Sequence, residues 1–118
     1  MWHLKHSDSK PFDFDGLQIR DYTSGLGQSA SVAVIEVPPG IRHRNARSHR
    51  SDKYYVSLDG EVSFSVCGKA VLMKPTDVLI VPRLEWFSYV NETNRPSRLL
   101  LVHVPAFDLD GEEFAEPV

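Results

Sequence analysis

Short β-rich segments separated by turn residues are the feature that most constrains the fold of this chain. Gly, Pro, Asp and Asn separate the segments, and these residues suit tight turns or cannot continue a strand ladder. Asp59-Gly60 is the clearest hairpin signal. No amphipathic helix longer than two turns interrupts the pattern. Nine segments are predicted as strands, at residues 17–22, 31–37, 46–50, 53–58, 61–66, 70–73, 78–81, 86–90 and 98–104. The sequence therefore predicts an all-β, antiparallel sandwich or barrel.

The apolar pattern within the segments predicts how they are buried. In residues 62–66, apolar side chains alternate with serine, which predicts one buried face and one exposed face. Residues 32–35 and 99–102 are apolar on both faces, so we expect a second cover in addition to the core. A homodimer interface is the preferred cover, and the chain's own termini are the alternative.

Length and composition favour one soluble domain. The 118 residues suffice for one core, so we expect a single domain over residues 1–118, with its core at about 15–106 and extensions at both ends. The apolar runs are far shorter than the roughly 20 residues of a membrane-spanning helix. The N-terminus has no apolar stretch with a cleavage site, so we expect a cytoplasmic protein without a membrane partner. Cys67 is the only cysteine, which excludes an internal disulfide.

The charge is low overall but segregated along the chain. A net charge of −3 argues against a nucleic-acid partner, because proteins that bind nucleic acid usually carry a positive excess. The tail from residue 107 holds five acidic residues and no basic one. Five basic residues lie within 12 positions, namely Arg42, Arg44, Arg47, Arg50 and Lys53. We expect this basic run to be solvated or paired with the acidic tail.

Two stretches resemble the conserved motifs of the cupin superfamily. Pro38-Pro39-Gly40, Arg47-Ser48-His49 and residues 53–61 resemble the first motif, G-x5-H-x-H-x3,4-E-x6-G. Pro82, Phe87 and Asn91 stand in the register of the second motif, G-x5-P-x-G-x2-H-x3-N. The resemblance covers residues 38–91 and implies a double-stranded β-helix, the jelly-roll barrel of cupins.

The resemblance also predicts that the usual metal site is degenerate. Cupins typically hold a divalent metal through three His and one Glu. With a first spacer that is one residue longer, these positions correspond to Arg47, His49, Lys53 and Phe87. Arginine and phenylalanine cannot ligate a metal, and lysine is protonated at neutral pH, so no metal cofactor is expected. The alternative is a divalent metal held by His43, His49 and His103 with a carboxylate.

Strand alternation predicts a basic and aromatic pocket at the same place. We expect it to bind a small anionic or sugar-derived ligand through inward-facing side chains. Two buried cations need nearby negative charge, which an anionic ligand, solvent or an internal acid such as Glu36, Asp52 or Glu85 would supply. A structural ion pair is the alternative role for the cations. The predicted ligand-binding residues are Arg47, His49, Lys53, Tyr55, Phe87 and Tyr89.

These residues leave three functions open. The first is a small-molecule-binding protein without a metal, or a metal-independent isomerase or epimerase, with His49 as the acid or base and Tyr55 as a proton relay. This reading relies on analogy with metal-independent cupin-like enzymes. The second is a metal-dependent cupin enzyme, a dioxygenase or an isomerase. The third is a non-catalytic sensing or interaction domain whose pocket is vestigial.

Overall fold

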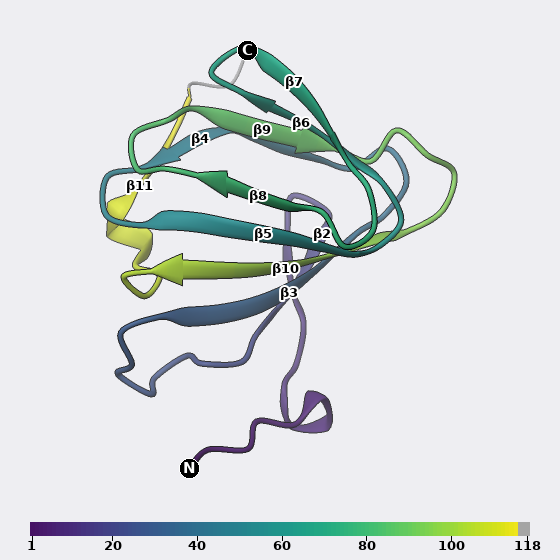
Figure 1. Ribbon diagram of the computed structural model, residues 1–118. Helices are drawn as coiled ribbons and strands as arrows, with labels where there is room; N and C mark the ends of the chain where they lie inside the picture. The colour runs from purple at the N-terminus through teal and green to yellow at the C-terminus, as the bar shows by residue number, and fades with distance from the viewer. Residues whose placement is uncertain (116–118) are drawn as a thin grey trace.

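Two antiparallel sheets face each other in the computed structural model, which describes residues 1–115 (Figure 1). The six-stranded sheet has the order β1-β2-β3-β10-β5-β8, and its strands are β1 (Phe12–Phe14), β2 (Leu17–Asp21), β3 (Ser31–Val37), β10 (Ser97–Val104), β5 (Asp52–Asp59) and β8 (Val78–Val81). The five-stranded sheet has the order β11-β4-β9-β6-β7, and its strands are β11 (Glu112–Phe114), β4 (Arg42–Ser48), β9 (Phe87–Val90), β6 (Val62–Val66) and β7 (Lys69–Met73). Short 3-10 turns lie at η1 (His6–Asp8) and η2 (Leu109–Gly111). The predicted all-β antiparallel fold is confirmed.

Each of the nine predicted segments overlaps a strand, but the sheets are larger than predicted. β4 begins at Arg42, four residues before the predicted start. β1 and β11 lie outside the predicted core of residues 15–106. β1 joins the edge of the six-stranded sheet through β2, and β11 pairs with β4. The acidic tail is therefore part of the second sheet.

The Asp59-Gly60 turn joins β5 to β6. Gly60 has a φ of +72°, a conformation that side-chain-bearing residues rarely adopt. A Cβ at this position would also lie 3.0 Å from the Cα of Ser97. Glycine is therefore required here by both conformation and space.

Aromatic side chains fill the core between the sheets. Val62 and Phe64 of β6 are buried, as their alternation with serine predicts. The Phe64 ring centroid lies 4.8 Å from that of Tyr89 and 5.0 Å from that of Tyr55, so three strands contribute to one aromatic cluster. Burying each of these rings stabilises the fold by roughly 1.5–3 kcal/mol.

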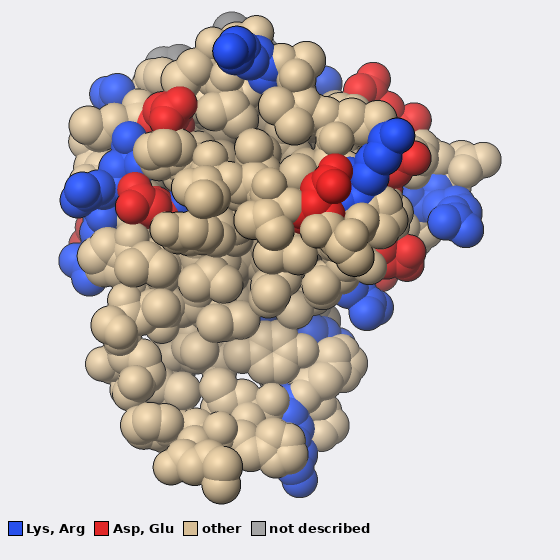
Figure 2. All heavy atoms as spheres, viewed as in Figure 1, with Lys and Arg blue, Asp and Glu red and all other residues tan. Residues whose placement is uncertain are grey.

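The outer face of the six-stranded sheet is largely apolar. Across neighbouring strands, Leu100 is paired with Val34 and Val56, and Ile80 is paired with Tyr54. Ile80 is 51% exposed. In the view of Figures 1 and 2, the surface over β3, β10, β5 and β8 is mostly uncharged, and charged groups gather toward its margins. This face is where the predicted homodimer would form, and the homodimer stays a prediction.

Helical structure in residues 1–115 is limited to the two short 3-10 turns, and no helix of the described chain is long and apolar enough to span a membrane.

Candidate functional site

A cavity of about 360 Å³ lies between the two sheets, and we call it the chamber. Its walls are mainly aromatic and aliphatic, and they include Phe14, Ile35, Leu101 and Phe114. β11 and η2 close one side of it through Glu112, Phe114 and Leu109. Its polar and ionisable lining residues are Asp21, Ser31, His43, Lys53, Tyr55, Tyr89, His103 and Glu112. The chamber is thus an apolar space with a small number of groups capable of chemistry.

His43 enters the chamber from β4, just before an irregularity in the pairing of β4 with β9. Its ring centroid lies 5.0 Å from those of Phe87 and Tyr89. Its Nδ1 lies 2.7 Å from the carbonyl oxygen of Arg44, so Nδ1 carries the proton and donates, and Nε2 keeps a free lone pair. Burial lowers the pKa of His43 to about 4, which keeps the ring neutral at neutral pH.

Lys53 brings a buried ammonium group into the chamber from β5. Its Nζ donates to the Glu112 carboxylate of β11, and it lies 2.8 Å from Nε2 of His103 on β10. Burial lowers the pKa of Lys53, and the charge of Glu112 opposes this shift. Burial, together with the Lys53 charge, lowers the pKa of His103 to about 3. His103 is therefore a neutral acceptor, and the ion pair of Lys53 with Glu112 is the charged feature beside it.

Two buried tyrosines complete the polar lining. Burial raises the pKa of Tyr55 and that of Tyr89, so both hydroxyls stay protonated at neutral pH. The Tyr89 hydroxyl is buried and finds no hydrogen-bond partner among residues 1–115. An unpaired buried hydroxyl is costly, so it is a natural contact point for a polar atom of a ligand.

The structure corrects the predicted positions of Arg47 and His49. Ala46 and Ser48 are the inward, buried residues of this part of β4. Arg47 instead binds Glu113 of β11, with its Nε 2.9 Å from Oε1. His49 has a half-exposed side chain and shares that oxygen at 2.6 Å. The predicted placement of these two residues in the pocket is wrong, so His49 is not positioned to act on a ligand in the chamber.

The cause of this error is a one-residue shift in register. The five-residue spacer of the cupin motif, counted from Gly40, ends at Asn45, so the two histidine positions of the motif fall at Ala46 and Ser48. Both residues face inward in the structure. Accepting a spacer one residue longer placed the predicted pocket residues on the opposite face of the strand, because side chains alternate.

The other predicted ligand-binding residues do meet. Lys53, Tyr55 and Tyr89 line the chamber. Phe87 is buried behind it, with its ring centroid 5.5 Å from the Lys53 Nζ. Ligand binding by these four residues stays a prediction. Sequence reasoning missed Glu112, and it considered His43 only as an alternative metal ligand.

The charge balance of the chamber differs from the prediction. Glu112 compensates Lys53, whereas the expected acids are engaged or placed elsewhere: Asp52 accepts from the backbone of Arg83, and Glu85 lies at the surface beside Cys67. With Asp21 also in the lining, the described chamber holds two carboxylates and one ammonium group. The expected excess of positive charge is absent here, so the reason for preferring an anionic ligand is lost. As expected, the acidic tail pairs with the basic run, through Glu112 and Glu113.

The chamber does not fit the metal site of the fold. The motif positions hold Ala46, Ser48, Lys53 and Phe87, which offer no set of metal-ligating donors. The alternative ligands His43, His49 and His103 are not brought together. Within the described part of the chain, no group of three His, Cys, Asp or Glu residues is placed to hold an ion.

Comparison with known proteins identifies the class. The family model of the cupin domain matches residues 33–103, more than half of the chain. The chain therefore belongs to the cupin family. No curated protein sequence matches it.

Solved structures extend the likeness over the whole fold. Structures of Streptomyces PAC13, described as a unique nucleoside dehydratase, superpose with a TM-score of 0.86 at 22% identity and cover 100% of this chain and 93% of theirs. Three are variants with uridine, in which one histidine is replaced by glutamine or a tyrosine by phenylalanine. A predicted oxalate decarboxylase of Thermotoga maritima gives a TM-score of 0.79 at 21% identity, covering 88% of this chain and 99% of that one. KdgF from Halomonas sp. gives 0.82 at 14% identity, covering 92% and 96%. At these identities the likeness shows the fold alone.

Proposed function

We propose that this chain is a metal-independent acid–base enzyme that acts on an uncharged nucleoside- or sugar-derived ligand bound in the chamber. The observation that carries the proposal is His43, a neutral imidazole set among aromatic rings. Its Nδ1 is held by a backbone carbonyl, and within residues 1–115 its Nε2 makes no hydrogen bond. A neutral imidazole fixed in this way is equipped to remove a proton from a ligand.

The reaction that suits these groups begins with removal of a proton next to a carbonyl. His43 Nε2 takes the proton, and negative charge develops on the carbonyl oxygen. The ammonium of Lys53 and the hydroxyls of Tyr55 and Tyr89 line the same chamber and are suited to stabilise that oxygen. Return of a proton to the other face of the same carbon gives an epimerase, return of a proton to the former carbonyl carbon gives an isomerase, and loss of a hydroxyl from the next carbon gives a dehydratase. Both outcomes share the same first step.

The shape and charge of the chamber support an uncharged ligand with a flat, apolar part. Aromatic rings form much of the wall, and the Lys53–Glu112 pair contributes no net charge. PAC13 adds independent support, because its structures contain uridine and its substituted residues are a histidine and two tyrosines. This chamber holds the same residue types in His43, Tyr55 and Tyr89.

Thermal unfolding with ligands in the presence of a chelator tests the binding part of the proposal. Uridine should raise the melting temperature, because a ligand of the native state stabilises by about 2.7 kcal/mol at 100 times its dissociation constant. Uridine 5′-monophosphate should stabilise less, since the chamber carries no excess positive charge. Stabilisation by divalent metals alone, or by the monophosphate in preference to uridine, would contradict the proposal.

Proton exchange separates an enzyme from a non-catalytic sensing domain. In deuterated water with chelator, the wild-type protein should exchange a proton next to the carbonyl of a small ketose from a panel that includes ribulose and xylulose. The His43→Gln variant should bind uridine but lose the exchange. A folded wild type that binds uridine and exchanges none of the panel would favour the sensing domain over the enzyme.

A further inference from the structure

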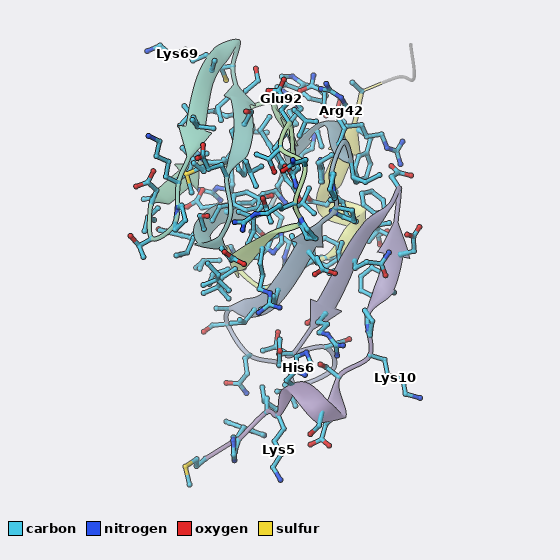
Figure 3. The ribbon with its side chains drawn as sticks, turned by 90° about the vertical axis from the view of Figure 1, so that its right-hand side faces the viewer. Lys5, His6, Lys10, Arg42, Lys69 and Glu92 are labelled. Atoms are coloured by element: carbon cyan, nitrogen blue, oxygen red, sulfur yellow. The ribbon has the colours of Figure 1, made fainter. Side chains whose placement is uncertain are left out.

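Lys53 differs from every other lysine of the chain in its environment. Its exposed fraction is 3%, whereas Lys5, Lys10, Lys69 and Lys74 are exposed. Figure 3 shows the labelled Lys5, Lys10 and Lys69 extending away from the body of the protein. A buried amine in an apolar space is expensive to keep protonated, and burial lowers the pKa of Lys53 even with a carboxylate beside it. This environment favours an amine that acts as a nucleophile.

The two groups that contact Lys53 Nζ supply the proton transfers that a nucleophilic amine needs. The Glu112 carboxylate accepts a hydrogen bond from Nζ and lies at the position where a departing proton is received. The neutral His103 ring accepts at 2.8 Å and holds the side chain in place from β10, the strand paired with β5 in the same sheet. Phe87 covers Nζ with its ring centroid 5.5 Å away. Nζ is therefore oriented, and it lines the space that receives a ligand.

We propose that Lys53 captures an aldehyde or ketone ligand as an imine within the chamber. The proposal rests on the proposed function only in placing the ligand there. The ammonium passes one proton to Glu112, and the free amine attacks the carbonyl carbon, forming a C–N bond and a carbinolamine. Glu112 then returns the proton to the carbinolamine oxygen, the C–O bond breaks, and water leaves. The sum is R-NH3⁺ plus a carbonyl giving an iminium plus water, with charge conserved.

Charge and solvation both favour this product in the chamber. The iminium carries the same positive charge as the ammonium it replaces, so the ion pair with Glu112 is restored once the imine has formed. The apolar walls limit the water that would hydrolyse the imine. The iminium also withdraws electrons from the neighbouring C–H bond more strongly than a carbonyl does, which eases proton removal by His43.

A second hollow adjoins the chamber that Lys53 lines. This hollow, of about 600 Å³, lies beside the 22–30 loop and shares Phe12, Asp21, Ser31 and Phe107 with the chamber. Because four residues line both spaces, the hollow lies directly beside the chamber. A carbonyl ligand held in the hollow is therefore next to the space that Lys53 lines.

Reductive trapping tests the proposal directly. The full-length protein is incubated at pH 7 with glyceraldehyde or benzaldehyde and cyanoborohydride, which reduces an imine to a stable amine, and the modified lysines are mapped by peptide mass. At limiting aldehyde, the adduct should appear at Lys53 before the four exposed lysines, which serve as internal controls. Adducts confined to Lys5, Lys10, Lys69 and Lys74 would overturn the proposal. The wild-type map decides this without relying on any variant.

Two variants separate this proposal from the proposed function. Lys53→Arg keeps the positive charge opposite Glu112 and removes the nucleophile, so a folded variant should lose the inner adduct and keep the outer ones. His43→Gln should keep trapping at Lys53, because the proton transfers of imine formation run through Glu112. Trapping at Lys53 without proton exchange would leave the imine proposal standing and reject the proposed function. Proton exchange without trapping at Lys53 would reject the imine proposal and leave the proposed function standing. Loss of trapping in a folded His43→Gln variant would also count against the imine proposal.

Discussion

Replacing Tyr89 with phenylalanine should stabilise the empty protein and weaken ligand binding. The Tyr89 hydroxyl is buried and finds no partner within residues 1–115, so the empty protein bears the cost of desolvating it. Phenylalanine keeps the ring, which lies 4.8 Å from that of Phe64 and 5.0 Å from that of His43 between centroids. The substitution therefore removes the cost and retains the packing.

The expected size follows from the burial of that one oxygen atom. An unsatisfied buried hydroxyl costs about 1–3 kcal/mol, so the variant should gain about 1–2 kcal/mol in the free energy of unfolding. For a chain of this length, that corresponds to a rise in Tm of about 3–6 °C for each kcal/mol. The hydrogen bond lost to a bound ligand is worth about 0.5–1.5 kcal/mol, which weakens uridine binding about 2- to 13-fold.

Chemical denaturation and calorimetric titration with uridine measure the two effects on the same samples. Tyr54→Phe is the matched control, because Tyr54 lies on β5 of the other sheet with its side chain on the outer face, where loss of the hydroxyl should change neither quantity by more than about 0.5 kcal/mol. A Tyr89→Phe variant that is less stable than the wild type, with unchanged affinity for uridine, would refute the reasoning.

Three further predictions concern other parts of the molecule. Because burial holds the pKa of His103 at about 3 while an unfolded histidine titrates near 6.5, only the unfolded state takes up this proton as the pH falls from 6.5 to 3. Stability should therefore drop over that window by up to about 1.4 kcal/mol per pH unit, and denaturation of a His103→Gln variant should show a shallower drop. Arg47→Ala should leave the affinity for uridine within twofold of wild type by calorimetry, because Arg47 binds Glu113 outside the chamber. A larger loss of affinity would indicate that Arg47 takes part in ligand binding. If the homodimer forms through the apolar outer face, Ile80→Glu should shift the sedimentation mass to that of a monomer, and an unchanged dimer would place the interface elsewhere.

Local sequence signals were enough to predict the fold, because turn chemistry and alternation act over a few residues. Asp59-Gly60 predicts the β5–β6 hairpin, and the alternation in residues 62–66 identifies the buried face of β6. The same Asp-Gly turn signal is present at Asp15-Gly16. Both residues have positive φ values, and they join β1 to β2. The first hairpin was therefore predictable, although it was not predicted.

The candidate site was harder to predict, because it depends on strand register and on a contact made across a long sequence separation. An irregularity between His43 and Ala46 decides which residues of β4 face the chamber. The alternation of polar and apolar residues does not reveal this irregularity. The only sequence signal for it is the motif spacing counted from Gly40. Glu112 reaches Lys53 across 59 positions, through a strand of three residues. A strand this short has too little pattern to be recognised before its partner is known.

The most direct test of the proposed function is a crystal structure of the protein grown with uridine and a chelator. We expect uridine within the chamber, with a polar atom within hydrogen-bond distance of the Tyr89 hydroxyl and another part of the ligand facing His43 Nε2. Uridine bound at the outer pair of Arg47 and His49, or a tightly held metal ion in the chamber despite the chelator, would contradict it.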